Sequence, residues 1–219
     1  MNGDIAIRAV DIASAAIVLL GVWLAITRSI GEGTWLLAAQ SLCMGAAALV
    51  VGVARGSIEL MIGGLLAIAV RAVVLPIVLR RLLRDSPVRH ERHAYLGPRA
   101  SAAAAIVIVF VAALAVDGTT GFPGGGSIHA LPAAVAEVLT GLLLISTRRK
   151  SLSMIIGLLV FENGVTFAAF AITAGMPLVV ELGISFDLLI VMAVVQVHAR
   201  RMLTTFGSLS TDRLRSLRG

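Results

Sequence analysis

The sequence predicts an all-α protein that crosses a membrane about seven times, and three observations support this prediction. Hydrophobic residues make up 58% of the 219 positions and charged residues only 14%, and the mean hydropathy is +1.00, a composition typical of membrane proteins. Seven apolar runs each approach the roughly 20 residues that a helix needs to cross a bilayer. The gaps between the runs are alternately rich and poor in arginine, as in polytopic membrane proteins.

The N-terminal region, residues 1–99, contains the first three predicted helices, at about 7–27, 35–54 and 58–79. The first run is expected to be a retained span rather than a signal peptide, because Asp4 and Asp11 interrupt its beginning and no small-residue cleavage site follows it. Only the residues ARGS separate the second run from the third, which predicts a tight helical hairpin. Pro76 lies inside the third run and is expected to kink that helix.

The second half of the chain is divided by a loop rich in glycine and proline. Residues 100–130 comprise a short fourth helix, at about 100–117, and this loop, whose composition excludes a continuous helix. Residues 131–199 form a three-helix unit, and residues 200–219 a basic tail. The helices of the unit are predicted at about 131–147, 153–174 and 177–198.

The arginines determine the expected orientation. Six arginines lie in the segment from Arg80 to Arg99, three basic residues follow the fifth helix at 148–150, and the tail carries more. The gaps after the fourth and sixth helices contain no Lys or Arg. With seven spans, the positive-inside rule places the N-terminus outside and the C-terminus in the cytoplasm. The expected location is the inner (plasma) membrane of the cell.

The same distribution accounts for the net charge of +6 without a nucleic-acid partner, because the basic residues lie between the apolar runs, where topology places them. Lipid headgroups are the expected electrostatic partner. Cys43 is the only cysteine, so no intramolecular disulfide is possible, and no Cys/His cluster has the spacing of a metal site. The sequence therefore predicts no cofactor and no metal in this chain, and no chemistry of its own beyond proton movement.

Two carboxylates in the middle of apolar runs are the strongest functional signal. Glu162 and Asp187 lie about ten and eleven residues from the cytoplasmic ends of the sixth and seventh helices, so both are expected roughly 15 Å deep, near the bilayer midplane. A charge at that depth costs at least a few kcal/mol and is seldom found without a role. We favour a shared site of reversible protonation. In the alternative, each acid is neutral and only hydrogen-bonds to a neighbouring helix.

Four other embedded groups are candidates for the same path. Glu137, in the fifth helix, fits a helix–helix hydrogen bond and a relay role equally well. Arg71, in the third helix, either extends toward the cytoplasmic surface or faces the interior and sets the charge of the carboxylates. Gln40 either extends a polar path or holds two helices together. Glu181 lies in the outer part of the seventh helix, where contact with water or headgroups is favoured over a role in the path.

Two segments resemble the hydrogenase-4 component E family. They are STRRKSLSMIIGLLVFENGVTFAAFAI, from Ser146 to Ile172, and RAVVLPIVLRRL, from Arg71 to Leu82. The members of that family are membrane subunits of formate-hydrogenlyase-type nickel–iron hydrogenase complexes. The length and the number of spans also fit, so the resemblance extends over essentially the whole chain.

The last three helices also look like the K subunit of respiratory complex I and the C subunit of multisubunit Na⁺/H⁺ antiporters. In those subunits a basic turn precedes an IGLE motif. Here Arg148 and Arg149 precede IGL at 156–158, but the acid, Glu162, comes three residues later than the motif requires, nearly one helical turn on. The next helix of those subunits carries a second buried acid, which Asp187 matches in depth better than Glu181 does.

The resemblance implies a complex in which soluble redox subunits oxidise or evolve hydrogen, while membrane subunits anchor this soluble arm and move protons or Na⁺. It also implies that this chain holds no nickel, iron–sulfur cluster, flavin or quinone. The alternatives are a subunit of a multisubunit Na⁺/H⁺ antiporter, a purely structural membrane anchor, and a stand-alone secondary transporter. A transporter is expected to show paired broken helices around a central site, for which one proline in the third helix is poor support.

Overall fold

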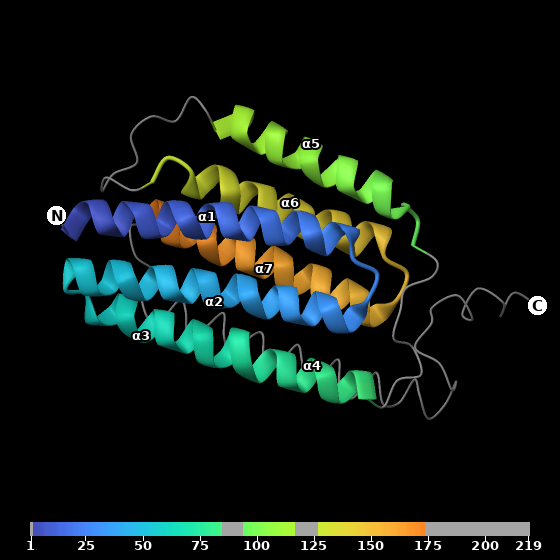
Figure 1. Cartoon of the computed structure of the whole chain (residues 1–219), viewed down its shortest axis with the longest axis horizontal. Coiled ribbons are helices and arrows are strands. Elements are labelled where there is room, and N and C mark those ends of the chain that lie inside the picture. Colours follow the sequence, from blue (N-terminus) through green and yellow to red (C-terminus); the bar gives the residue numbers. More distant parts are fainter. Residues whose placement is uncertain (1, 85–93, 117–126, 174–219) are drawn as a thin grey trace, which may run out of the picture.

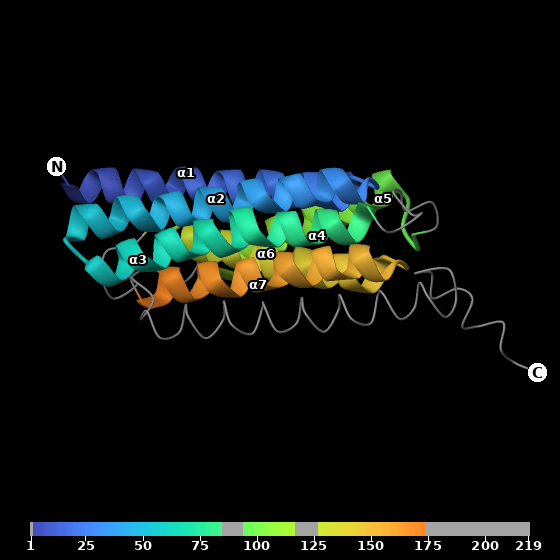
Figure 2. The same cartoon turned by 90° about the horizontal axis from the view of Figure 1, so that it is seen from below.

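The computed structural model describes residues 2–84, 94–116 and 127–173. Six helices in these ranges are long and apolar enough to span a membrane, and they lie side by side along one axis (Figure 1; Figure 2). They match the first six predicted spans to within a few residues at each end, which confirms the all-helical, membrane-spanning class. The seventh predicted helix and the basic tail lie outside the described residues, so the number of spans and the orientation stay predictions.

The helices are labelled in chain order, and a π-helical segment, η1, joins two of them. Their bounds are α1 Asn2–Ile26, α2 Ile30–Arg55, α3 Ile58–Ala67, η1 Ile68–Val74, α4 Leu75–Arg84, α5 Pro98–Val116, α6 Ala130–Thr147 and α7 Ser151–Thr173.

The turn between α2 and α3 is the tight hairpin that ARGS predicts. Gly56 ends α2 with a φ of 66°, a left-handed conformation that glycine adopts without the steric penalty of a side chain. The hydroxyl of Ser57 then accepts a hydrogen bond from the backbone N–H of Leu60 and so caps the first turn of α3. Ser29 caps α2 in the same way, by accepting from the N–H of Glu32.

A π-helical segment, η1, interrupts the third span just before Pro76, while the kink predicted at this proline stays a prediction. Proline has no N–H to donate, and its ring collides with the carbonyl four residues earlier, here that of Ala72. Wider turns relieve such conflicts inside membrane helices. Because η1 ends two residues before Pro76, the helix absorbs the disturbance around Arg71.

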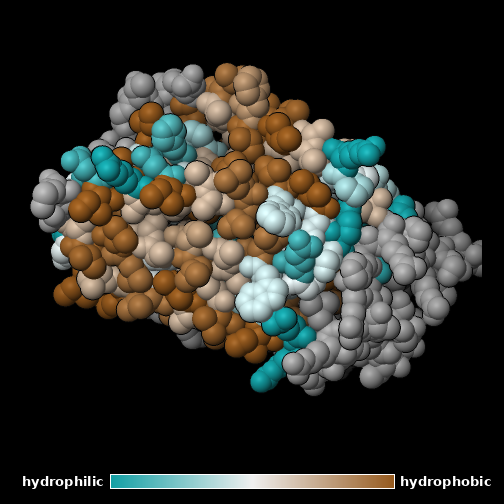
Figure 3. Space-filling model, in the orientation of Figure 1, coloured by the Kyte–Doolittle hydropathy of each residue, from teal (hydrophilic) through white to brown (hydrophobic). Residues whose placement is uncertain are grey.

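Two apolar clusters fill the interior, one toward each end of the bundle. The first contains Leu24, Leu37, Leu79, Leu144 and Leu159, among others. The second includes Ile17, Met44, Ala134 and Phe167. On the face shown in Figure 3, the middle of the bundle is broadly apolar, and hydrophilic residues gather toward its ends.

Glycines allow α6 and α7 to pack with their backbones in contact. A Cβ on Gly141 would lie 2.5 Å from the backbone nitrogen of Phe161, and one on Gly164 would lie 2.6 Å from that of Val138. Small residues at such crossings are the usual basis of close helix packing in membranes. This pair forms the most extensive helix contact among the described residues and fixes the position of the polar groups that both helices carry.

The basic turn between α6 and α7 holds the end of α1. Nη2 of Arg148 donates to the carbonyl oxygens of Leu24, Ala25 and Thr27, at 3.1, 3.1 and 2.9 Å. The last carbonyls of a helix have no partner within the helix, and a cation is favourable there. Arg148 therefore joins the first helix to the last two described ones, and it is only 6% exposed.

Candidate functional site: a polar layer inside the bundle

Six buried polar side chains lie between the two apolar clusters, and we call them the polar layer. Each is at most 5% exposed, and together they come from α2, η1, α6 and α7. The members are Gln40, Ser41, Arg71, Glu137, Asn163 and Thr166.

Glu137 occupies the side of the layer nearest α1. Nε2 of Gln40 donates to Oε1 of Glu137 at 2.5 Å and to the carbonyl oxygen of Ile17 at 3.3 Å. A Cβ on Gly21 would lie 2.5 Å from Oε2 of Glu137, so the missing side chain of this glycine makes room for the carboxyl group. The helix–helix hydrogen bond that the sequence left open for Glu137 and Gln40 is present, while a relay role stays a prediction.

Arg71 occupies the opposite side of the layer and faces the interior. Its Nη1 donates to Oδ1 of Asn163 at 3.3 Å and to Oγ1 of Thr166 at 2.8 Å, and the residue is 1% exposed. The alternative in which Arg71 extends toward the cytoplasmic surface is therefore wrong. Buried hydrogen-bond acceptors on α7 replace part of the hydration that the guanidinium loses, which lowers the free-energy cost of the interior position.

The two sides of the layer are joined through neighbouring residues of α2. Nδ2 of Asn163 donates to Oγ of Ser41 at 3.2 Å, and Ser41 follows Gln40 in the chain. The sequence analysis missed Ser41, Asn163 and Thr166. A signal was present, because Asn163 and Thr166 are three residues apart in an apolar run and so share one face of a helix.

The acids of the last two predicted helices are only partly placed. Glu162 is half-buried on α7. At 3.6 residues per turn it lies about 100° around the helix from Asn163, between the buried Thr166 and Val165, which is 41% exposed, and its Oε2 is buried. Glu162 therefore lies at the border between the buried face of α7 and its partly exposed face. Asp187 and Glu181 lie outside the described residues, and the pairing of Glu162 with Asp187 is untested.

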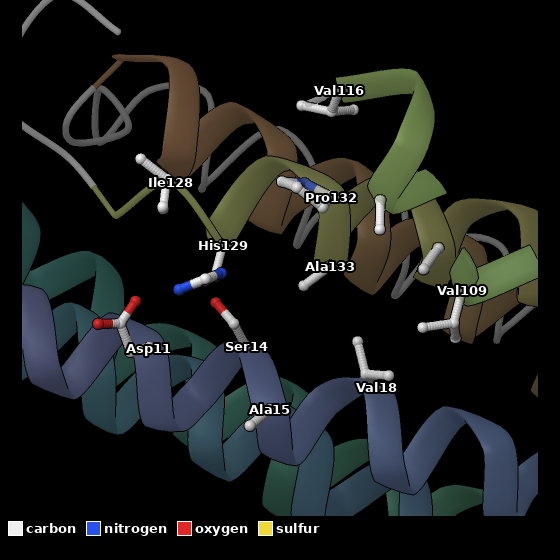
Figure 4. A pocket seen from close by; sticks show the side chains of 12 residues that line it. Asp11, Ser14, Ala15, Val18, Val109, Val116, Ile128, His129, Pro132 and Ala133 are labelled. Atoms are coloured by element: carbon white, nitrogen blue, oxygen red, sulfur yellow. The ribbon is translucent and has the colours of Figure 1, made fainter. Parts of the chain in front are cut away.

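A cavity of about 440 Å³ lies between α1, α5 and α6. Asp11, Ser14 and His129 line it toward the end that holds the N-terminus (Figure 4), and the rest of its lining is apolar. The carboxylate of Asp11 accepts a hydrogen bond from the Ser127 hydroxyl. The Ser14 hydroxyl donates to the carbonyl of Val10 at 2.8 Å.

No group of three or more His, Cys, Asp or Glu residues within the described ranges is placed to hold a metal ion. The polar layer offers one carboxyl group, one guanidinium and neutral amides and hydroxyls. Such a set can bind and release a proton and can stabilise a charge, but it offers no nucleophile with an adjacent base.

The fold and the polar layer define an integral membrane protein with a buried, hydrogen-bonded set of polar groups across its helices. The chain belongs to the same family as the uncharacterized protein Rv0085 of Mycobacterium tuberculosis, to which it is 32% identical over 210 residues that cover 95% of this chain and 96% of the relative. It is also 29% identical to hydrogenase-4 component E of Escherichia coli K12 over 161 residues, 74% of each chain. The protein of that name from Shigella flexneri is similar to the same extent.

No family model matches the chain, and no solved structure matches it. The identity of 29% to hydrogenase-4 component E nevertheless supports, at a moderate level, the resemblance that the sequence motifs indicate. The likeness of the last three helices to the K subunit of complex I stays a prediction.

Proposed function

We propose that the chain is a membrane subunit of a hydrogenase complex of the formate-hydrogenlyase type, where it anchors the soluble redox arm and contributes to a proton or cation path. The similarity to hydrogenase-4 component E over three quarters of both chains carries the first part of this proposal. In such a complex the nickel and iron–sulfur groups belong to the soluble subunits, and this chain holds no cofactor of its own.

The polar layer supports the second part of the proposal. Each of its members is buried in an apolar bundle, where polar groups are costly and usually mark ion paths or contacts within the interior. A purely structural layer needs only neutral hydrogen bonds, whereas this one contains both Glu137 and Arg71. We extend the path to Glu162 and Asp187, and we propose that the predicted seventh helix packs against α7 so that these two acids share one site. Glu181 would lie nearer the outer surface.

Mild detergent extraction tests membership of a complex. A tagged chain is expected to elute at the size of a large assembly, together with other membrane subunits and soluble subunits that contain nickel and iron. Untagged membranes serve as the control for non-specific recovery. Elution of the chain alone would favour a stand-alone transporter, and elution with membrane subunits but without nickel would favour a multisubunit Na⁺/H⁺ antiporter.

The proposed orientation places the N-terminus outside and the arginine-rich end of the bundle in the cytoplasm of the cell. Gly3 and Gly97 lie at opposite ends, and a Cβ at either position meets nothing within 4 Å, so each accepts cysteine without strain. In a background with Cys43→Ala, a membrane-impermeant thiol reagent added to intact cells is expected to label Gly3→Cys and to leave Gly97→Cys unlabelled until the cells are opened. The reverse pattern would overturn the orientation.

A further inference from the structure

The geometry points to a proton-binding site formed by Glu137 and Gln40, which water reaches from the N-terminal end of the bundle through the cavity between α1, α5 and α6. This inference rests on the proposed translocation function and names both its ion and its outer access route. Three observations support it: the hydrogen bonding of Gln40, the position of the cavity, and the protein groups that surround Glu137.

Glu137 is surrounded by three helices and has one hydrogen-bond partner among the described residues, the amide of Gln40. At 1% exposure its carboxyl group can change charge only by taking up or releasing a proton inside the bundle. Arg71, the other charged side chain of the layer, is linked to it through Asn163, which Arg71 binds, and the adjacent residues Ser41 and Gln40.

The side-chain oxygen of Gln40 has no hydrogen-bond donor among the described residues. Both N–H groups are used, one by Glu137 and one by the carbonyl of Ile17, and these two acceptors fix which way the amide faces. Oε1 is buried and accepts no hydrogen bond from any described residue. A buried acceptor left unpaired is unfavourable, and a water molecule that donates to it removes this cost.

The cavity runs from the N-terminal part of the bundle toward the level of this amide, and its lining includes the chain neighbours of Ile17 and Glu137. Its polar end carries Asp11 and His129 (Figure 4). The lining residues furthest along α1 and α6 are Val18 and Ala136. Val18 follows Ile17, whose carbonyl binds Gln40, and Ala136 precedes Glu137. At about 30 Å³ per water, the cavity has room for on the order of ten molecules.

The surroundings of Glu137 suit a proton and not Na⁺. A bound Na⁺ in a membrane helix bundle is coordinated by several oxygens, commonly backbone carbonyls freed where a helix is broken. Here the side chain nearest the carboxylate presents N–H groups, and α1, α2 and α6 are continuous α-helices at this level. The π-helical segment η1 contains Arg71, whose guanidinium donates to Asn163 on α7.

Carbodiimide labelling of the intact complex in native membranes tests the ion. Dicyclohexylcarbodiimide reacts with protonated carboxyl groups in apolar surroundings, and peptide mass spectrometry reports labelling at each carboxylate separately. Labelling at Glu137 is expected to fall as the pH rises, to be absent in Glu137→Gln, and to be unchanged by NaCl. If the site bound Na⁺, salt at ten times the dissociation constant would protect it about tenfold, and this result would overturn the assignment.

A matched pair on α5 tests the access route. Ala113 lines the cavity, whereas Ala115, on the same helix, is exposed and does not. In a background with Cys43→Ala, a small charged thiol reagent added outside is expected to label Ala113→Cys and not Ala115→Cys, because only the first lies in water. Equal failure of both would show that lipid or a partner helix fills the cavity and would overturn the route.

Ion flux in proteoliposomes that contain the whole complex completes the test. Glu137→Gln and Ala113→Phe are expected to lower proton flux per hydrogen turned over, and Glu59→Gln, an exposed carboxylate on α3, is expected to leave it unchanged. Normal flux in an assembled Glu137→Gln complex would overturn the inference. The labelling results do not depend on the partners of the chain, so they stand or fall separately from the hydrogenase assignment.

Discussion

Replacing Gly141 by alanine is expected to destabilise the protein by about 3 kcal/mol, near the upper end of the usual cost of overpacking. The added Cβ would lie 2.5 Å from the backbone nitrogen and 2.6 Å from the Cα of Phe161. A backbone atom cannot turn aside as a side chain can, so α6 and α7 must move apart. That movement would also shift Glu137 relative to Asn163, because Glu137 lies on α6 and Asn163 lies on α7.

The effect is measured as the loss of folded, monodisperse protein on heating in detergent. Gly3→Ala is the matched control, because a Cβ at Gly3 has nothing within 4 Å and surface substitutions usually change stability by less than about 0.5 kcal/mol. Similar melting of both variants would mean that α6 and α7 do not pack at backbone contact.

The membrane spans were predictable from the sequence because their signal is local. A run of about 20 apolar residues and the turn residues at its ends decide whether a helix forms, and the ARGS turn is an example. The directions of the helices were less predictable. In a helix that is apolar on every side, hydrophobic periodicity does not show which face meets the protein and which meets lipid.

The polar layer shows this limit residue by residue. Glu137, Gln40 and Arg71 could be selected from the sequence because a polar group in an apolar run is costly wherever it points. Their partners could not be selected, since the contact between Gln40 and Glu137 joins residues 97 positions apart. It depends on Gly21, whose missing side chain admits the carboxyl group and whose role no pattern indicates. The interior position of Arg71 likewise depends on Asn163 and Thr166, whose spacing in an apolar run indicates a shared helix face but does not indicate that Arg71 is its partner.

Replacing Arg71 by leucine is expected to destabilise the bundle by about 3 kcal/mol or more. The guanidinium donates to Asn163 and to Thr166, and hydrogen bonds from a charged donor each contribute about 1.5–3 kcal/mol. Leucine would also leave Oδ1 of Asn163 buried without its donor. Arg71→Lys is expected to recover only part of the loss, because a single ammonium on a shorter stem does not reproduce the planar fork of donors.

Arg81 provides the control for charge, because it lies on α4 of the same continuous helix and is exposed. Melting in detergent and the yield of assembled complex are compared for Arg71→Leu, Arg71→Lys and Arg81→Leu. An arginine that extended to the membrane surface would tolerate leucine as Arg81 does, so equal behaviour at the two positions would contradict the buried arrangement. A large loss at Arg71 with partial recovery by lysine would show that the geometry of the guanidinium, as well as its charge, holds η1 against α7.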